Sequence, residues 1–476
     1  MDTQLHDRLN LPYAELEEMN LQAKADRKAR VPIEKVREAR LSYLAGEPRV
    51  KAVTVLFSDL EGRLHMLDYD KAFLLKSWDN LTFDGSSIRG FTAQRESDLR
   101  LGIDWNAFYW VPGDIFGSGK VMVFGEVIDK DGGVYRADIR SVLKAYAETQ
   151  YQTHGYTLNA ANEIEGFLFQ GENAERRYHE TGKFEYVNTG GYYHSLPGDP
   201  LRQFIDQSAE VQRALGFENE KDHPEVAPSQ FEINYSYADV VTAADQIQLY
   251  KLACRQVATK MGLTACFLPK PVVGVNGSGM HTNVSVMKNG KNIFWDPKGE
   301  EKMSKAAWQF VDRILSHGND ICLVLNASVN AYRRLDPHFE APNQIKASAV
   351  DRGSMIRIPI GNERSARVEV RSVAPDANPY MTLLAVFQTG LDGSIAKMKN
   401  IRDAERYLPD NIYDALENFR KAEWTTTLLG EDVKKRYADL KQSSADRCPR
   451  LLGTFVKSLE VQHHHEVYNQ FLWNMF

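Results

Sequence analysis

Apolar and polar residues alternate along residues 156–169, a stretch without proline, and this pattern predicts a β-strand. Side chains two positions apart on a strand point to the same face, so Glu163 and Glu165 would share one face while Ile164 and Leu168 face a core. Neighbouring carboxylates repel each other, and a bound divalent cation removes that repulsion. A single Glu-x-Glu pair is most often a solvated strand face, so its meaning depends on whether the pattern recurs.

The same alternation recurs in later segments, each with polar residues on one face. These are 231–235 with Glu232, 280–285 with His281, Asn283 and Ser285, 354–359 with Arg357, and 367–371 with Arg367, Glu369 and Arg371. Glu225 lies just upstream of the first of them, in a predicted His-Pro-Glu turn. Carboxylates and imidazole without thiolates suit Mg²⁺ or Mn²⁺, and arginines match phosphate and carboxylate groups. If these strands are neighbours, their polar faces would line a cleft that holds metal, phosphate and carboxylate.

Helix and strand patterns alternate along the rest of the chain. Helices are predicted at 32–45, 137–149, 201–215, 239–261, 303–317, 319–331 and 378–398, and further strands within 51–68 and 102–128. Residues 171–200 are expected to form mainly a loop, and residues 1–30 a loose, charge-rich helical arm. The small polar residues at 129–133 mark a domain boundary. We therefore expect an arm at 1–32, a first domain at 33–131 and a second domain at 132–476.

Composition excludes several function classes. Of the 476 residues, 43% are hydrophobic and 26% are charged, which is ordinary for a globular protein. The net charge of -6 gives no basic field for nucleic acid or an anionic membrane. No apolar run approaches a membrane span, and the N-terminus lacks a secretion signal, so a cytoplasmic protein is expected. The 4 cysteines show no Cys-x-x-Cys spacing and imply neither a disulfide framework nor a zinc site.

Three further features carry less weight. The Gly-rich stretch at 276–279 lacks the lysine of a P-loop and leads into a strand, so its glycines are expected to let the backbone approach a small substrate. The consecutive residues His463, His464 and His465 do not converge on one helix face and are expected at an interface or surface. The aromatic C-terminal segment, 468–476, suggests docking onto another surface.

Ordered motifs give the chain a family resemblance. The segments FDGSSI, NEIEGFLF, HPEVAPSQFEI, NGSGMH, FEAP, IRIP and VEVR occur in the order found in glutamine synthetases, and the chain most resembles the bacterial-type (type I) enzymes over residues 33 to about 400. The resemblance implies an α+β fold, with an N-terminal β-grasp domain followed by a catalytic domain whose antiparallel sheet lines the active-site cleft. It also implies a homo-oligomer, a dodecamer of two hexameric rings with active sites between subunits.

The resemblance also assigns roles to residues. One metal site would use Glu165, Glu225 and Glu232, and the second Glu163, His281 and Glu369, with two or more Mg²⁺ or Mn²⁺ ions per site. Substrate L-glutamate would contact Asn276, Gly277, Arg334 and Arg371. ATP would contact Glu220, Tyr237, Ser285, Arg352, Arg357 and Arg367. Ammonium would contact Asp84, Ser87, Tyr192, Glu225 and Glu340, and the catalytic groups would be Asp84, Glu340 and Arg352.

The implied reaction is ATP-dependent ligation of ammonia to glutamate through a γ-glutamyl phosphate. One alternative is a γ-glutamyl ligase for a polyamine or other amine, which predicts loss of the anionic ammonium pocket. The presence of Asp84, Ser87, Tyr192 and Glu340 favours ammonia. The other alternative, a catalytically dead relative, predicts missing metal ligands, and all six are present.

The chain also departs from the family pattern. Asn283 stands where type I enzymes often have a second histidine near the nucleotide base, and the N-terminal arm is longer than usual. Tyr413 resembles a tyrosine that some bacterial enzymes adenylylate, although the sequence after it differs from the family pattern.

Overall fold

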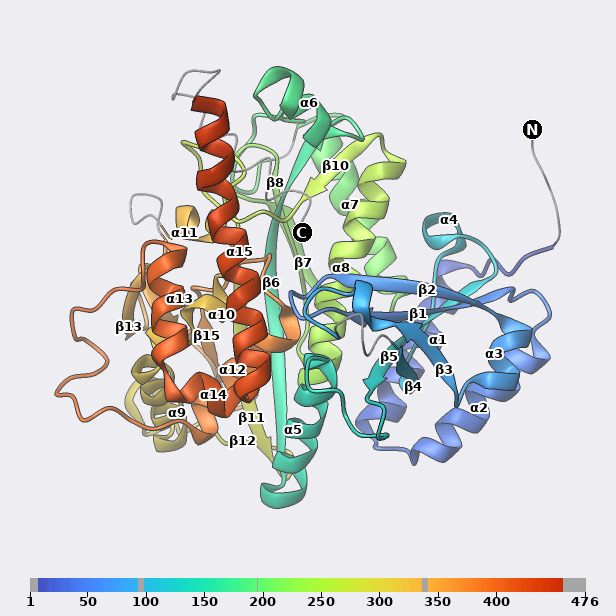
Figure 1. Ribbon diagram of the computed structural model, residues 1–476, viewed down its shortest axis with the longest axis horizontal. Coiled ribbons are helices and arrows are strands. Elements are labelled where there is room, and N and C mark those ends of the chain that lie inside the picture. The colour runs from blue at the N-terminus through green and yellow to red at the C-terminus, as the bar shows by residue number, and fades with distance from the viewer. Residues whose placement is uncertain (1–6, 93–97, 195, 336–340, 457–476) are drawn as a thin grey trace.

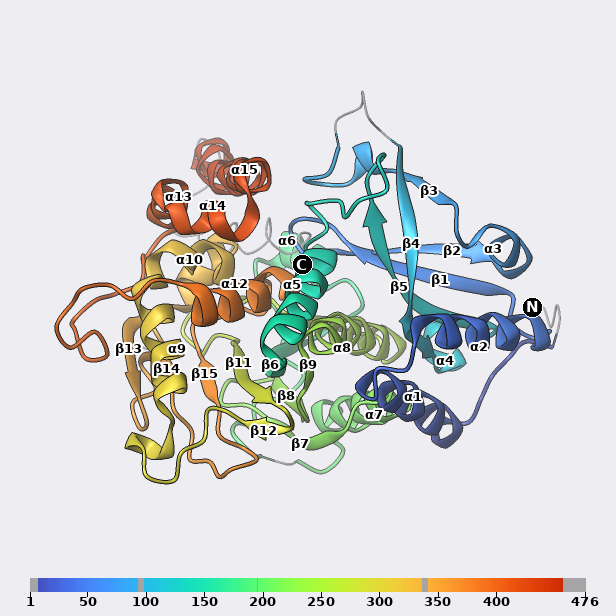
Figure 2. The ribbon, with the colours of Figure 1, turned by 90° about the horizontal axis from the view of Figure 1, so that it is seen from below.

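The first part of the chain forms a five-stranded mixed sheet (Figures 1 and 2). The computed structural model describes residues 7–92, 98–194, 196–335 and 341–456. The strands are β1 (Ala52–Ser58), β2 (Leu64–Asp70), β3 (Leu81–Asp84), β4 (Asp98–Trp110) and β5 (Lys120–Ile128), in the order β2-β1-β5-β4-β3. Only the β1–β5 pair among them is parallel. Helices α2 (Ile33–Gly46) and α3 (Lys71–Ser77) pack on this sheet, and the short α4 (Gly113–Phe116) follows β4.

The second sheet is long and mainly antiparallel. Its main path has the order β13-β14-β15-β11-β6-β8-β7, and only β13 and β14 pair in parallel along that path. The strands are β6 (Tyr156–Gln170), β7 (Asn219–Pro224), β8 (Gln230–Tyr235), β11 (Met280–Lys288), β13 (Gln344–Ser348), β14 (Ser354–Arg357) and β15 (Val368–Val370). Three short strands, β9 (Ala238–Asp239), β10 (Leu263–Cys266) and β12 (Lys291–Asn292), pair at its margins. The strand predicted at 156–169 is confirmed as the central β6.

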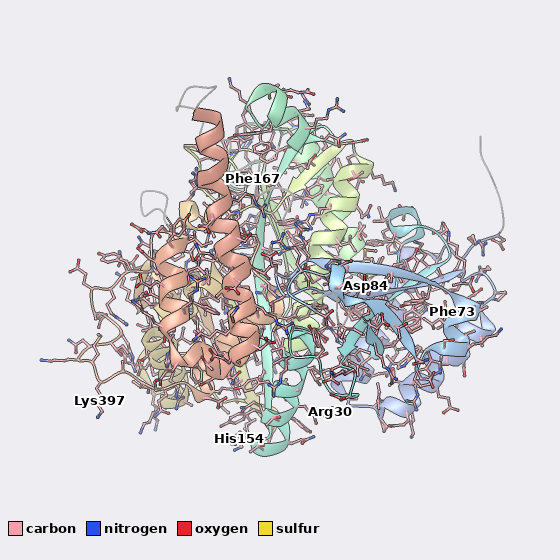
Figure 3. All side chains as sticks on the ribbon, viewed as in Figure 1. Arg30, Phe73, Asp84, His154, Phe167 and Lys397 are labelled. Carbon is pink, nitrogen blue, oxygen red and sulfur yellow. The ribbon has the colours of Figure 1, made fainter. Side chains whose placement is uncertain are left out.

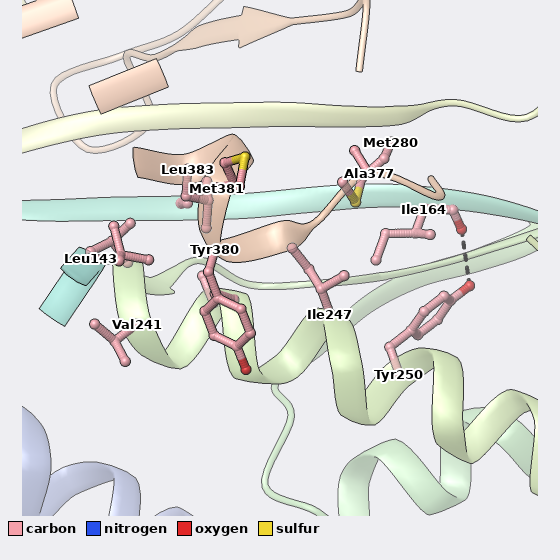
Figure 4. Packing of buried hydrophobic residues seen from close by; sticks show 14 of the residues in the cluster. Leu143, Ile164, Val241, Ile247, Tyr250, Met280, Ala377, Tyr380, Met381 and Leu383 are labelled. Atoms are coloured by element: carbon pink, nitrogen blue, oxygen red, sulfur yellow. Dashed lines mark hydrogen bonds between the residues drawn. The ribbon is translucent and has the colours of Figure 1, made fainter. Parts of the chain in front are cut away.

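Helices bury the apolar face of this sheet. α8 (Val240–Lys260) lies against β6 and contacts α5 (Ile139–His154), α7 (Pro200–Ala214) and α12 (Pro379–Asp392). Figure 4 shows Ile247 and Tyr250 of α8 beside Ile164 of β6, where the Tyr250 hydroxyl donates to the Ile164 carbonyl oxygen at 3.0 Å. Because strand side chains alternate, burial of Ile164 on this face turns Glu163 and Glu165 to the other.

A further group of helices lies beyond β11 and β15. They are α9 (Lys305–Ser316), α10 (Gly318–Leu325), α11 (Val329–Arg334), α13 (Ile412–Lys421), α14 (Glu423–Leu429) and α15 (Glu431–Val456). The long helix predicted at 239–261 is confirmed as α8. Within the described residues, no helix is both long enough and apolar enough to cross a membrane.

Several predicted elements were wrong in part. The expected loop at 171–200 contains the helix α6 (Ala174–Thr181). The helix predicted at 319–331 is two helices, since the chain turns at 326–328 and the Ser328 hydroxyl caps the start of α11. The helix predicted to reach 398 ends at Asp392. The predicted His-Pro-Glu turn is also wrong, because His223 and Pro224 end strand β7 and pair with β8.

The N-terminal arm is a packed helix rather than a loose one. α1 (Tyr13–Lys28) lies against α7 and β4, and its buried positions include the polar residue Asn20. The Asn20 amide donates to the carbonyl oxygens of Trp110 and Ala214, at 2.8 and 2.7 Å. α1 therefore links the first sheet to the helices of the second.

A buried ion-pair network also joins the two parts of the molecule. The Arg140 guanidinium, at the start of α5, binds both oxygens of Asp245 on α8 at 2.8 Å and one oxygen of Asp104 on β4 at 2.9 Å. The Tyr380 hydroxyl donates to the same Asp245 at 2.8 Å. Since the three charged groups are almost inaccessible to water, the network stabilises the structure only when it is complete.

We predict that Arg140→Met lowers the free energy of unfolding by about 3–5 kcal/mol, because it leaves the buried Asp245 carboxylate without its cation. Asp104 keeps its contact with Lys144 Nζ at 3.1 Å. Urea unfolding at one fixed protein concentration measures the change. The control is Arg136→Met, which alters an exposed arginine four positions earlier and should change stability by less than about 0.5 kcal/mol. Equal effects of the two substitutions would contradict a structural role for the network.

Candidate active site

Strand register brings the polar residues of the second sheet together. His281 of β11 lies opposite Glu163 of β6, and Asn283 of β11 lies opposite Glu369 of β15. On the other side of β6, Glu165 lies opposite Glu232 of β8. The face opposite the helical layer therefore carries two neighbouring clusters of carboxylates and imidazoles.

The first cluster consists of Glu163, His281 and Glu369. One possible ligand atom from each residue lies within 4.8 Å of the others, and His281 Nδ1 is 3.5 Å from Glu163 Oε2. Glu369 is fully buried, and its Oε2 atom accepts no hydrogen bond within the described structure. Arg357 Nε forms an ion pair with this oxygen at 3.3 Å. The two carboxylates and the imidazole form a ligand set that fits Mg²⁺ or Mn²⁺.

The second cluster consists of His223, Glu225 and Glu232, whose possible ligand atoms also lie within 4.8 Å of one another. Glu165 adjoins it through β6, and one of its oxygens accepts a hydrogen bond from the Gly279 amide at 2.7 Å. Asn234 donates to Glu232 at 2.6 Å. Sequence reasoning missed His223 as a member of this cluster, because the proline after it was interpreted as a turn signal.

The pKa values of the carboxyl groups shift in different directions in the two clusters. Burial and the charge of Glu165 raise the pKa of Glu225 to about 8, and burial together with the neighbouring carboxylates raises the pKa of Glu232 well above its usual range. In the first cluster, the pKa of Glu163 falls to about 2, because a hydrogen bond and the charge of His281 outweigh burial. The second cluster thus holds carboxylates that cannot all ionise without a cation beside them.

Three arginines lie next to the first cluster, and two of them, Arg334 and Arg371, are buried. Arg371 Nη1 binds Glu369 at 2.5 Å, Arg357 Nε lies 3.3 Å from the same carboxylate, and Arg334 donates to the Arg371 carbonyl oxygen at 3.0 Å. Arg334 Nη1 and Arg371 Nε are buried donors without a hydrogen-bond partner among the described residues. Two such unpaired donors can bind a carboxylate that enters the site.

The glycine-rich stretch before β11 makes room for Arg334. A Cβ atom on Gly277 would lie 3.0 Å from Arg334 Cγ, and one on Gly279 would lie 2.5 Å from Arg334 Nη2. Asn276 adjoins this stretch and is half-buried. These contacts explain why a side chain is excluded there.

The predicted nucleotide-binding residues lie along the same sheet. Ser285 is on β11, Arg357 on β14 and Arg367 just before β15, where Arg367 Nε donates to Asn283 at 2.9 Å. Asn283 also donates to Glu163 at 3.2 Å, so its side chain is committed to the first cluster. Arg352 and Glu220 are exposed, and Tyr237 is 54% exposed.

The predicted ammonium-binding residues are divided between the two sheets. The ring of Tyr192 stands edge-on to His223 with centroids 5.5 Å apart, which places it beside the second cluster. Asp84 and Ser87 lie at the end of β3 in the other sheet, and the Asp84 carboxylate accepts from Ser86 and Ser87 of its own loop. Figure 3 shows Asp84 in the small domain, while Phe167 marks β6 in the large one. The structure does not bring Asp84 into contact with either cluster through any described hydrogen bond.

Some predicted residues fall outside the site or the described structure. Glu340, the three consecutive histidines and the aromatic segment at 468–476 lie outside the described residues. The Tyr413 hydroxyl donates to the Ala445 carbonyl oxygen at 3.1 Å, between α13 and α15. Its adenylylation stays a prediction.

Comparisons with known proteins agree with this arrangement. The family model "Glutamine synthetase, beta-Grasp domain" matches residues 49–130, and "Glutamine synthetase, catalytic domain" matches residues 136–452. The glutamine synthetase of Staphylococcus aureus (strain MRSA252) is 37% identical over 429 residues, which are 84% of this chain and 93% of that protein. The Staphylococcus epidermidis enzyme is 36% identical over the same length.

Solved structures share the fold. A GmaS/ADP complex superposes with a TM-score of 0.75 at 23% identity, covering 89% of this chain and 98% of that one. Apo GmaS without ligand gives a TM-score of 0.74 at 24% identity, with 89% and 97% covered. The predicted fold class, a β-grasp domain followed by a catalytic domain with an antiparallel sheet, is confirmed.

We predict that the apparent affinity for Mg²⁺ rises as the pH increases from 6 to 8 and then levels off. A raised pKa means that the metal-free cluster retains protons at neutral pH, and a cation must displace them, which gives about a tenfold change per pH unit for each proton released. Titration calorimetry in buffers of different ionisation enthalpy measures both the affinity and the proton release.

Glu225→Gln should weaken the binding of Mg²⁺ and make its affinity depend less on pH, since it removes the carboxyl group whose pKa is about 8. Glu363→Gln, at an exposed position before β15, is the control and should leave both unchanged. An affinity independent of pH between 6 and 9 in the unmodified protein would refute the prediction.

Proposed function

Since this chain belongs to the glutamine synthetase family, we propose that it ligates ammonia to L-glutamate at the expense of ATP, giving L-glutamine, ADP and phosphate. The observation that carries the proposal is the pair of carboxylate–imidazole clusters beside two buried, unpaired arginine donors. A catalytically dead relative would lack part of this set.

The chemistry follows from the poor reactivity of a carboxylate. Transfer of the γ-phosphoryl group of ATP to the γ-carboxylate oxygen of glutamate forms an acyl phosphate and releases ADP. Ammonia then attacks the acyl carbon, the bond from that carbon to the phosphate oxygen breaks, and phosphate leaves. Divalent cations, when bound, neutralise charge on the transferred phosphoryl group.

The arginines and the exposed face of the sheet would handle the anions. Arg334 and Arg371 can bind the glutamate α-carboxylate through their unpaired donors, and Asn276 and Gly277 would lie beside the same substrate. Arg352, Arg357 and Arg367 would neutralise the phosphates, with Glu220, Tyr237 and Ser285 around the nucleotide. Glu340 would close the site against water, since an exposed acyl phosphate hydrolyses.

Ammonium would bind near Tyr192 and Glu225 and must lose a proton before it can attack. Asp84 is suited to take that proton, and Ser87 lies in the same loop. Because Asp84 belongs to the first sheet and its hydrogen bonds stay within its own loop, we propose that it acts in the site of a neighbouring subunit. A dodecamer of two hexameric rings would supply such neighbours.

One observation favours a second candidate. The solved structures that share this fold carry the name GmaS rather than glutamine synthetase, so the second candidate is a γ-glutamyl ligase for another amine. Retention of Asp84, Ser87 and Tyr192 supports ammonia, because an acceptor with a carbon chain needs space and fewer charges.

Phosphate release with ATP, glutamate and a panel of acceptors distinguishes these functions. Ammonium should give the highest kcat/KM among ammonium, methylamine, ethylamine and putrescine. A higher value for any amine would replace the proposed function by an amine ligase, and no release with any acceptor would indicate a dead relative.

The shared site has its own test, which mixes two inactive variants. Asp84→Ala removes the proposed base and Glu369→Ala disables the metal cluster, so each homo-oligomer should be nearly inactive. In a randomly co-assembled equal mixture, about one quarter of the sites pair an intact Asp84 with an intact cluster, and activity should recover to that extent. Confirmed mixed oligomers with no more activity than the two variants separately would contradict a site shared between subunits.

A further inference from the structure

His223 is a member of the second cluster to which neither the family resemblance nor the predicted chemistry gives a role. It lies on β7 directly opposite Glu232 of β8. Its Nε2 atom is 3.7 Å from Glu232 Oε1, and its Nδ1 atom is 3.6 Å from Glu225 Oε1. Only 7% of the side chain is exposed, so the imidazole is enclosed together with the two carboxylates.

Hydrogen bonding assigns the two ring nitrogens different roles. Nδ1 lies 3.2 Å from the Pro224 carbonyl oxygen, which can only accept, so Nδ1 carries the hydrogen. In this neutral tautomer Nε2 has a free lone pair that faces Glu232. Nε2 is buried and has no hydrogen-bond partner in the described part of the chain.

An ordinary core histidine would have both nitrogens satisfied, because an unpaired buried polar atom costs about 1–3 kcal/mol. Here the unpaired atom is Nε2, whose lone pair points at carboxylate oxygens. Ionised carboxylates have no hydrogen to donate to it. A cation between them satisfies all three groups at once. A backbone carbonyl that holds the opposite nitrogen is also the usual way in which metal-binding histidines are oriented.

Packing fixes the ring in this orientation. Tyr192 and Tyr193 stack on each other with centroids 3.8 Å apart, and both stand edge-on to the imidazole, at 5.5 and 4.9 Å. Pro224 next to it pairs with Phe231 and holds the end of β7 against β8. The imidazole is therefore positioned before any cation arrives.

We propose that His223 Nε2 is a ligand of the divalent cation held by Glu225 and Glu232, so that each of the two clusters contributes one imidazole to its cation. This inference rests on the proposed metal-dependent function. Relative to carboxylates alone, an imidazole shifts preference from Mg²⁺ toward Mn²⁺ and other transition-metal ions. The second cluster should therefore select Mn²⁺ more strongly than an all-carboxylate site.

The test counts the imidazoles bound to Mn²⁺ in the full-length protein. Pulsed electron paramagnetic resonance on protein containing ¹⁵N-labelled histidine detects each coordinated ring nitrogen. With both clusters loaded, the unmodified protein should show two imidazoles per chain, one from His281 and one from His223. Since this count uses the unmodified protein, it does not depend on whether a variant folds.

Variants assign the signals. His223→Gln should remove one imidazole coupling and weaken Mn²⁺ binding at that cluster by at least the roughly tenfold that loss of a supporting group causes. His281→Gln should remove the other coupling, and His194→Gln, at an exposed histidine near Tyr193, should remove neither.

A single imidazole in unmodified protein that still forms glutamine would overturn the ligand assignment and leave the proposed function standing. An unchanged count in a folded His223→Gln protein would also overturn it. Failure of the unmodified protein to bind Mn²⁺ would overturn both the assignment and the proposed function.

Discussion

Carboxylates that are held together on one face of the second sheet repel each other, and the surrounding fold has to hold them in place. Glu165 and Glu232 are cross-strand neighbours, and Glu225 follows the strand beside them. Burial and the neighbouring carboxylates raise the pKa of Glu225 and of Glu232, so the fold keeps these groups close at an energetic cost. The opposite face supplies the compensation, because burial of Ile164 under Tyr250 and Ile247 fixes the register of β6. A slip by one residue would turn the glutamates into the core.

The arrangement gives functional meaning to features that otherwise look like defects. The same polar face carries unpaired donors on Arg334 and Arg371 and an unpaired nitrogen on His223. In a core these groups would be costly, but in a binding site they are satisfied by ligands. The glycines at 277 and 279 serve the same purpose, since they leave space for the Arg334 side chain.

The spacing of apolar residues predicted the strands and helices that position the site, but it did not predict which strands lie side by side. β6 and α8 carry strong apolar repeats and were predicted nearly to their ends. The alternation along β6 also predicted correctly that Glu163 and Ile164 point to different faces of the sheet. Alternation cannot say that His281 lies across from Glu163, since that pairing joins residues more than a hundred positions apart; the ordered family motifs supplied that connection. α1 was expected to be loose because residues 1–30 are rich in charged side chains, but Leu16 and Ala23 are buried on one face together with the polar Asn20. His223 was missed because a proline inside a strand edge resembles a turn.

Two cations should bind on this polar face, one at each cluster. Anomalous diffraction from crystals of the full-length protein soaked in Mn²⁺ tests this expectation most directly. Two peaks per chain are expected, one among Glu163, His281 and Glu369 and one among His223, Glu225 and Glu232. A single peak, or peaks away from these residues in crystals that contain ATP and Mn²⁺, would contradict it.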